Sequence, residues 1–293
     1  FFLFGLFAAG FSALDSDDGS EDDDSVPETP EQPEQPEQPT PQDPNLTLIG
    51  GIGADQLSGA GGDDLLRGLG GDDHLDGNDG QDLLYGDSGD DTLEGDDGTD
   101  GLVGGFGDDR LWGEDGNDVI AAGPGDDRAF GGEGDDFIEG WTGEDTLSGQ
   151  EGDDVLLGVN VGNGAILTEQ PLDDDVLNGG DGDDFLVLGS GDEAIGGEGA
   201  DTFVTGTHVN PADVPMITDW ETADEALMVV VDDGATGVVT ISEDSSTDDM
   251  ANVYFDGVLV AQVAGAFGEI GTTDITVVQA SDFDIPEFTA SAA

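Results

Sequence analysis

The stretch that decides the fold is residues 131–139, Gly-Gly-Glu-Gly-Asp-Asp-Phe-Ile-Glu, one of twelve nine-residue units that follow one another in frame from Gly50 to Leu157. Position 4 of the unit is Gly and position 6 is Asp in all twelve copies. Position 1 is Gly in every copy except the one that begins at Ala122, and position 8 is Leu or Ile in every copy except at Ala129. An acid-rich composition alone would not hold four positions to a period of nine, so the pattern predicts a repeat structure.

Each fixed position has a physical role. Gly at positions 1 and 4 allows a positive φ and a tight turn, which brings backbone carbonyl oxygens around a common point. Asp at position 6 adds a carboxylate oxygen, and such a cluster suits Ca²⁺, which takes six to eight oxygens at ~2.3–2.6 Å. We expect positions 7–9 to form a very short strand whose middle residue points inward. Because one unit cannot bury a single Leu by itself, the units must coil and stack to form a core.

The predicted metal ligands are the position-6 aspartates. Twelve of them belong to the in-frame units, and three belong to later units in which the pattern is less regular. Together they are Asp55, Asp64, Asp73, Asp82, Asp91, Asp100, Asp109, Asp118, Asp127, Asp136, Asp145, Asp154, Asp175, Asp184 and Asp201.

The consensus Gly-Gly-x-Gly-x-Asp-x-aliphatic-x resembles the repeat of the RTX (repeats-in-toxin) family over roughly residues 50–204. The resemblance implies an all-β fold, a right-handed parallel β-roll in which two units make one coil. It also implies that calcium lies between turns eighteen residues apart, so that Asp55 shares an ion with Asp73, and Asp64 with Asp82. Two rows of six turns would then hold about ten Ca²⁺ ions in the in-frame units.

The net charge sets limits on partners and compartment. The 293 residues carry a formal charge of −68, from 71 acids against Arg67, Arg110 and Arg128. Such a chain would not bind nucleic-acid phosphates, and it repels itself when compact. Cations must neutralise it, so we expect folding to be coupled to metal binding. Extracellular calcium modules bind at ~10⁻⁴–10⁻³ M, which indicates a location outside the cytoplasm. Cysteine is absent, which excludes disulfides and thiolate metal sites.

The first residues have a different character. Residues 1–14 are almost wholly apolar and are too short to span a bilayer, which takes ~20 residues. Because the chain starts at Phe1 rather than Met, we interpret them as the C-terminal part of a membrane-anchor helix; an uncleaved signal peptide is the alternative. Gly5 and Ala9 leave a flatter side that would suit contact with other integral membrane proteins. Residues 15–45 are acidic and Pro-rich and are expected to form a disordered, extended spacer.

The roll is expected over residues 46–204, with an insertion at 159–174 that is either a partner-binding loop or a surface excursion. Gly101 and the segment 122–124 depart from the repeat and predict softer coils. After one full unit at 179–187, the next unit is one residue short and carries Glu193 where Asp is expected.

Residues 205–293 lose the glycine pattern and alternate like β-strands, with a hairpin signal at Asp256-Gly257. The segment 217–220, Ile-Thr-Asp-Trp, followed by Asp224 and Leu227, resembles the segment after the repeats in RTX proteins exported by type I secretion. In that family it closes the roll, so we expect a small C-terminal β cap here.

Catalytic signals are weak. Only His74 and His208 are present, and neither lies in a His-Glu-x-x-His motif; Gly-x-Ser-x-Gly and Walker motifs are absent as well. Trp112 and Trp141 fall at outward positions, as partner anchors or as incidental exposed aromatics. The sequence thus favours a non-enzymatic calcium-binding roll on the extracytoplasmic, periplasm-facing side of a bacterial membrane, anchored in the bilayer through residues 1–14, in a structural or binding role such as an accessory subunit of a membrane complex. An exported RTX protein, secreted by the type I route, is the alternative.

Overall fold

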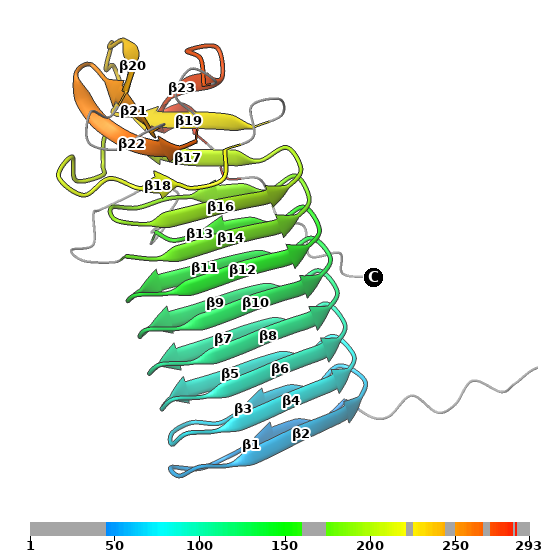
Figure 1. Ribbon diagram of the computed structural model, residues 1–293. Helices are drawn as coiled ribbons and strands as arrows, with labels where there is room; N and C mark the ends of the chain where they lie inside the picture. Colours follow the sequence, from blue (N-terminus) through cyan, green and yellow to red (C-terminus); the bar gives the residue numbers. More distant parts are fainter. Residues whose placement is uncertain are drawn as a thin grey trace, which may run out of the picture. The chain divides into compact units, whose positions relative to one another are not determined.

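The computed structural model describes residues 45–159, 174–220, 225–243, 250–265, 270–283 and 285, and over these ranges the protein is an all-β parallel solenoid. The chain winds between two sheets, placing alternate strands in each (Figure 1). This confirms the predicted parallel β-roll. The predicted anchor, residues 1–14, and all but the last residue of the predicted linker lie outside the described residues. Within the described ranges, no helix is long and apolar enough to cross a bilayer.

The 11-stranded sheet contains the odd-numbered strands of the roll. In spatial order they are β1 (Thr47–Ile49), β3 (Leu65–Arg67), β5 (Leu83–Ser88), β7 (Gly101–Phe106), β9 (Val119–Pro124), β11 (Phe137–Thr142), β13 (Val155–Leu157), β15 (Phe185–Val187), β17 (Thr202–Gly206), β19 (Ala226–Val231) and β23 (Ile275–Gln279).

The 12-stranded sheet contains the even-numbered strands together with β21, and it ends in a meander. In spatial order they are β2 (Gln56–Gly61), β4 (His74–Asp79), β6 (Thr92–Asp97), β8 (Arg110–Asp115), β10 (Arg128–Glu133), β12 (Thr146–Glu151), β14 (Val176–Asp181), β16 (Glu193–Glu198), β18 (Met216–Ile217), β22 (Val258–Ala264), β21 (Met250–Phe255) and β20 (Val239–Glu243). One 3₁₀ turn, η2 (Ala280–Asp282), follows β23.

The register between neighbouring coils is eighteen residues, as two units per coil require. Leu66 pairs with Leu84 in parallel, for example. Across the insertion the step becomes thirty, because Thr146 pairs with Val176. Twelve extra residues are therefore accommodated without breaking either sheet; residues 160–173 of the insertion lie outside the described residues.

Most strands are longer than the expected three residues. A strand such as β10 (Arg128–Glu133) covers positions 7–9 of one unit and positions 1–3 of the next. The reason is that the glycine at position 1 keeps an extended backbone, while positive φ values fall at positions 2 and 4. Gly132 and Gly134, at positions 2 and 4, have φ values of 129° and 124°. Gly131, at position 1 within β10, does not have a positive φ. The prediction of positive φ was therefore right for position 4 and wrong for position 1.

The core is a stack of position-8 side chains between the two sheets. Leu66, Leu75 and Leu84 are fully buried, and the same holds for the position-8 residue of each later in-frame coil. Ala129, the small residue at this position, is fully buried too, and so is Ala122 at position 1. Stacking identical inward positions lets a chain with one Leu per unit build a continuous core.

The strands do not stop at residue 204, where the repeat pattern ends. β19 and β23 continue the 11-stranded sheet in parallel, and β18 pairs in parallel with β22. β20, β21 and β22 then form an antiparallel meander, with the predicted Asp256-Gly257 turn joining β21 to β22. Trp220 is buried against Phe203, with ring centroids 6.1 Å apart, so this end of the hydrophobic stack is covered.

Candidate metal-binding turns

The position-6 aspartates lie where each turn enters a strand, and they form two rows along the roll. In each row, Oδ1 of one aspartate accepts a hydrogen bond from the backbone N–H of the aspartate one coil earlier. Asp55 N donates to Asp73 Oδ1 over 2.7 Å, and Asp64 N donates to Asp82 Oδ1 over 2.6 Å. The two pairs that were expected to share ions are therefore neighbours. The first row is Asp55, Asp73, Asp91, Asp109, Asp127, Asp145, Asp175 and Asp192. The second row is Asp64, Asp82, Asp100, Asp118, Asp136, Asp154, Asp184 and Asp201.

The second carboxylate oxygen, Oδ2, is the unusual atom of these rows. From Asp64 onward the row aspartates are at most 3% exposed, so water does not solvate them. In many of them Oδ2 is buried and receives no hydrogen bond, which is costly for a charged oxygen. A cation beside Oδ2 would remove that cost. These Oδ2 atoms belong to Asp73, Asp82, Asp91, Asp100, Asp109, Asp118, Asp127, Asp136, Asp154, Asp184 and Asp201.

The glycine at position 1 leaves the space beside Oδ2 open. A Cβ atom added to Gly86 would lie 2.3 Å from Oδ2 of Asp91 and 2.6 Å from the carbonyl oxygen of Gly104. At Gly50 the matching distances, to Oδ2 of Asp55 and the carbonyl oxygen of Gly68, are 2.5 and 2.7 Å. A carboxylate oxygen and a carbonyl oxygen thus converge where any other residue would place a side chain. This close approach, rather than a positive φ, explains why position 1 is glycine in eleven of the twelve units.

Burial also sets the protonation of the rows. It raises the pKa of Asp100, Asp136 and Asp154 to about 8, an effect that the hydrogen bond from the preceding backbone N–H only partly offsets. Neighbouring carboxylates in the same row raise these pKa values further, because like charges disfavour ionisation. A bound cation would act in the opposite direction and hold the carboxylates ionised.

The donor set fits a hard cation. Within the described part of the chain, no three His, Asp or Glu side chains converge on one point. A metal here would therefore take its ligands from one or two row carboxylates together with backbone carbonyl oxygens. Such an all-oxygen set suits Ca²⁺, whereas zinc prefers the nitrogen and sulfur ligands that these turns lack. Calcium bound in the turns would supply the positive charge that the buried oxygens require.

The rows correct one detail of the sequence analysis. In the short unit after residue 187, Asp192 occupies position 6 and is fully buried, and it accepts a hydrogen bond from Asp175 N over 3.2 Å. Glu193 falls at position 7, because it pairs with Val176 at the start of a strand. The residue that this unit lacks is in its turn. Counting forward from the glycines therefore assigns Glu193 to position 6 and misses Asp192. Counting backward from the strand would have found it. Asp175, Asp184 and Asp201 do lie in the rows.

The second row, whose last member is Asp201, ends beside an aspartate from outside the repeats. The carboxylate of Asp219 accepts hydrogen bonds of 3.0 Å from the backbone N–H groups of Gly196 and Gly197. Asp219 belongs to the Ile-Thr-Asp-Trp segment, and its neighbours Ile217 and Trp220 are buried in the core. This segment therefore satisfies backbone donors of the last turn while it covers the stack.

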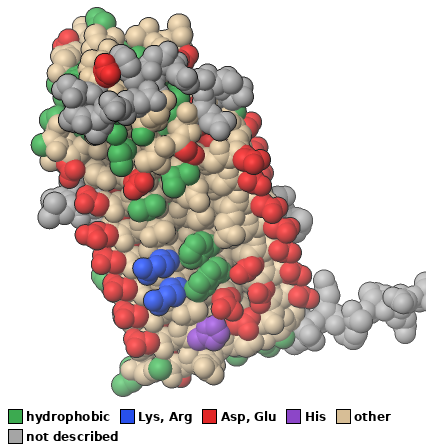
Figure 2. Space-filling model, in the orientation of Figure 1, with side chains coloured by type: hydrophobic (Ala, Val, Ile, Leu, Met, Phe, Trp, Pro, Cys, Tyr) green, Lys and Arg blue, Asp and Glu red, His purple; other side chains and the backbone are tan. Residues whose placement is uncertain are grey.

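Acidic side chains also follow the edges of the roll on its surface (Figure 2). Exposed position-5 carboxylates form a second ladder, in which Asp90 N donates to Asp72 Oδ1 over 3.2 Å and Asp108 N donates to Asp90 Oδ1 over 3.1 Å. The 12-stranded sheet carries a contrasting patch, where Trp112 and Phe130 stack with ring centroids 5.8 Å apart and the exposed Arg110 and Arg128 are paired in register.

The family comparison identifies the same repeat. A family model described as the RTX calcium-binding nonapeptide repeat (4 copies) matches residues 47–75, 58–93, 67–102, 94–129, 121–156 and 172–195. Among solved structures, the chain is similar to the extracellular lipase LipA from Serratia marcescens, with 17% sequence identity and a TM-score of 0.24. That alignment covers 80% of this chain and 40% of the lipase, so the chain spans about two fifths of the lipase's length. No curated protein matches the chain.

Proposed function

The chain belongs to the RTX calcium-binding repeat proteins, and on that premise we propose that it is a non-enzymatic, calcium-loaded β-roll displayed on the extracytoplasmic side of a bacterial membrane. Its role would be structural or binding, as an accessory subunit that residues 1–14 tether to a membrane complex.

One observation carries the calcium part of the proposal, namely the rows of buried Oδ2 atoms that receive no hydrogen bond. A chain with a charge of −68 gains stability from each divalent cation that enters such a row. Turns of this kind fill only where calcium is plentiful, because extracellular calcium modules bind at ~10⁻⁴–10⁻³ M. This requirement supports a place outside the cytoplasm.

The placement of the two histidines supports a non-enzymatic role. His74 lies in β4 at an outward, partly exposed position. Nε2 of His208 lies 3.4 Å from the carbonyl oxygen of Leu188. Burial lowers the pKa of His208 to about 4, so its imidazole stays neutral at neutral pH. The carboxylates of the roll, which are the other candidates for acid–base chemistry, are spaced by the repeat and already serve as acceptors in ladders.

Membrane fractionation tests the display. The chain should sediment with membranes and remain there after washes with high salt and with alkali, because the apolar residues 1–14 would hold it. Replacing Gly5 and Ala9 by Leu should keep the chain in the membrane but reduce co-purification of integral membrane proteins in mild detergent. Recovery of the chain only in the soluble fraction would contradict the membrane anchor. Unchanged recovery of partner proteins with the Leu variant would mean that residues 1–14 only tether the chain and do not contact other membrane proteins.

The alternative function is an RTX protein exported to the medium by the type I route. The position of the 217–220 segment, which covers the end of the roll as its resemblance implies, favours this reading. Intact chain in the culture medium, lost when a type I exporter is deleted, would establish export and exclude stable display on the membrane.

A further inference from the structure

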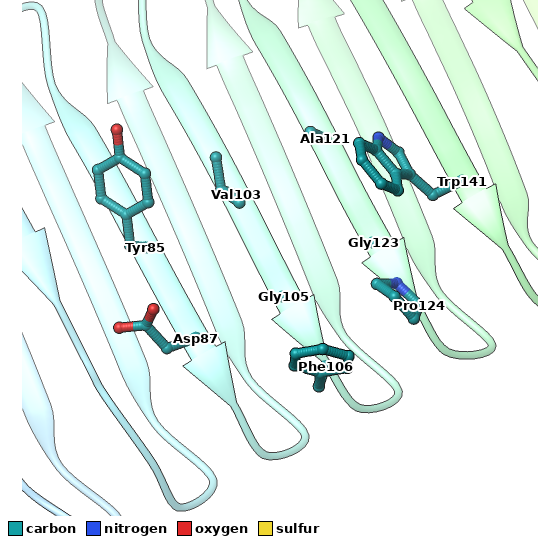
Figure 3. Close-up of a pocket in the computed structure, with 9 residues that line it drawn as sticks. All are labelled: Tyr85, Asp87, Val103, Gly105, Phe106, Ala121, Gly123, Pro124 and Trp141. Atoms are coloured by element: carbon teal, nitrogen blue, oxygen red, sulfur yellow. The ribbon is translucent and has the colours of Figure 1, made fainter. Parts of the chain in front are cut away.

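On the outer face of the 11-stranded sheet, several residues that depart from the repeat lie side by side on neighbouring strands. Tyr85, Val103 and Ala121 occupy the same outward position on β5, β7 and β9. At the next outward position along these strands, Gly105 and Gly123 carry no side chain. The small residues on β7 and β9 thus leave a hollow of about 250 Å³ on the outer face of the sheet (Figure 3).

Aromatic rings form the walls of this hollow. Tyr85 stands at one side and Trp141 at the other, with Phe106 and Pro124 toward the turn end of the strands (Figure 3). Trp141 is 41% exposed and Phe106 is 67% exposed, so both rings offer apolar surface to an incoming group. An aromatic side chain placed between such rings gains from stacking as well as from burial.

A second hollow, of about 320 Å³, adjoins the first and shares Tyr85, Val103 and Ala121 with it. Gly101 forms its floor where the other coils carry a larger residue, between Leu83 on β5 and Val119 on β9. Together the two hollows make one apolar trough across three strands. It lies on an outer face, away from the core and from the interior of the turns.

The charge in the first hollow is already balanced. Asp87 is the charged residue among those that line it, and Arg67 donates to Asp87 Oδ1 over 2.9 Å in an ion pair. The hollow is therefore a neutral apolar area on a chain whose net charge is −68. An uncharged, apolar group matches it better than a cation or an anion does.

The same face shows what kind of group it accepts. Three strands beyond β9, Phe283 stacks on Phe185 of β15 with ring centroids 6.3 Å apart, and Ile285 packs against the same outer hydrophobic cluster. Phe283 has an extended backbone, with φ of −81° and ψ of 130°. In this covered part Val155 is 8% exposed, whereas Leu83, at the equivalent outward position on β5, is 47% exposed. The trough therefore continues, on the same sheet, a surface that already binds an aromatic side chain from an extended segment.

We propose that the hollow between Tyr85 and Trp141 binds an aromatic side chain presented by an extended, uncharged segment of a partner protein. The segment would lie on the outer face of β5, β7, β9 and β11, as Phe283 lies on Phe185 of β15. The inference goes beyond the proposed calcium role and needs only a folded roll, whatever the chain's location.

The test uses the full chain in saturating calcium and a blocked synthetic peptide, Ser-Asn-Phe-Asn-Ile-Pro-Gln-Phe, an uncharged copy of residues 281–288. Isothermal titration should show saturable binding, which a peptide with both Phe replaced by Ala should lose. Ala121→Gln fills the hollow and should weaken binding by at least about tenfold, since burial of an aromatic ring is lost. Ser148→Gln, at the same repeat position on the 12-stranded sheet, should bind as the unmodified chain does. Circular dichroism and calcium titration of both variants report separately on the roll.

Three results would overturn the proposal. The first is absence of saturable binding to a chain that is folded and calcium-loaded. The second is equal affinity for Ala121→Gln and Ser148→Gln, which would place the peptide elsewhere, for instance at Phe185. The third is binding that appears only after removal of residues 286–293, because the hollow would then belong to the chain's own C-terminal segment.

Discussion

The backbone N–H of Asp64 donates a 2.6 Å hydrogen bond to Oδ1 of Asp82, eighteen residues later, while Oδ2 of Asp82 is buried and receives none. One oxygen of the carboxylate thus joins two coils, and the other is left for a cation. Because the same arrangement recurs at Asp91 and Asp109 of the first row and at further aspartates of the second, calcium should act on the roll as a whole rather than on a single turn.

The first prediction concerns chelation. Removing calcium at pH 8 should unfold the roll, because uncompensated carboxylates would face one another along both rows. Circular dichroism should show loss of the β signal on addition of a chelator and its return when calcium is added in excess. Magnesium is the matched control, since it demands a tighter octahedral site and should restore little of the signal. An unchanged spectrum in excess chelator would contradict coupled folding.

The second prediction concerns the number of ions. Calorimetry should find about ten calcium ions in the in-frame units, with further ions where Asp175, Asp184, Asp192 and Asp201 extend the rows. Asp192→Asn should lower the stoichiometry by about one ion, because it removes a carboxylate from the first row. Glu193→Gln changes the same charge at the adjacent, outward position and should leave the stoichiometry as it is. A total of one or two ions would refute the row model.

The third prediction concerns the glycine at position 1. In Gly113→Ala the new Cβ would lie 2.2 Å from Oδ2 of Asp118 and 2.6 Å from the carbonyl oxygen of Gly131, so the space beside the carboxylate would close. We expect weaker calcium binding and a loss of about 1–3 kcal/mol in the free energy of unfolding. Gly51→Ala is the control, because its Cβ would lie 3.6 Å from the nearest atom, Oδ2 of Asp55. Equal melting temperatures for the two variants in calcium would show that Gly113 can carry a side chain, as Ala122 does at the same repeat position.

The fourth prediction concerns pH in the absence of calcium. Burial raises the pKa of Asp100, Asp136 and Asp154 to about 8 in the folded chain, far above the ~3.9 of an exposed Asp. The folded state then binds more protons than the unfolded state, so its stability is greatest at acid pH and is lost as the pH rises through 6 to 8. A calcium-free roll prepared by dialysis should thus show a β signal and a melting transition at pH 5, and should lack both at pH 8.

Calcium should reverse this dependence, since it competes with protons for the same carboxylates. In saturating calcium the melting temperature should be higher at pH 8 than at pH 5. If both forms were most stable at pH 8, the raised pKa values of the rows would not be controlling stability.

The sequence by itself determined the nine-residue repeat, the position-8 side chains of the core and most of the aspartates of the two rows, because each of these features is present in a single unit. A Leu every nine residues has no burial except in a stack, and Asp at position 6 of every unit must then form rows. The parallel register of Leu66 with Leu84 and the contact of Asp64 with Asp82 both follow from two units per coil.

The tertiary structure alone decided the features that depend on contacts between coils. Gly113 is a glycine because Oδ2 of Asp118 and the carbonyl oxygen of Gly131, in the next coil, leave no room for a Cβ; a single unit shows only that glycine recurs. Asp192 belongs to its row because strand pairing, rather than residue count, sets the register after a deletion. The hollow beside Trp141 exists because small residues of β7 and β9, eighteen positions apart, are brought side by side, and no local pattern in the chain encodes that neighbourhood.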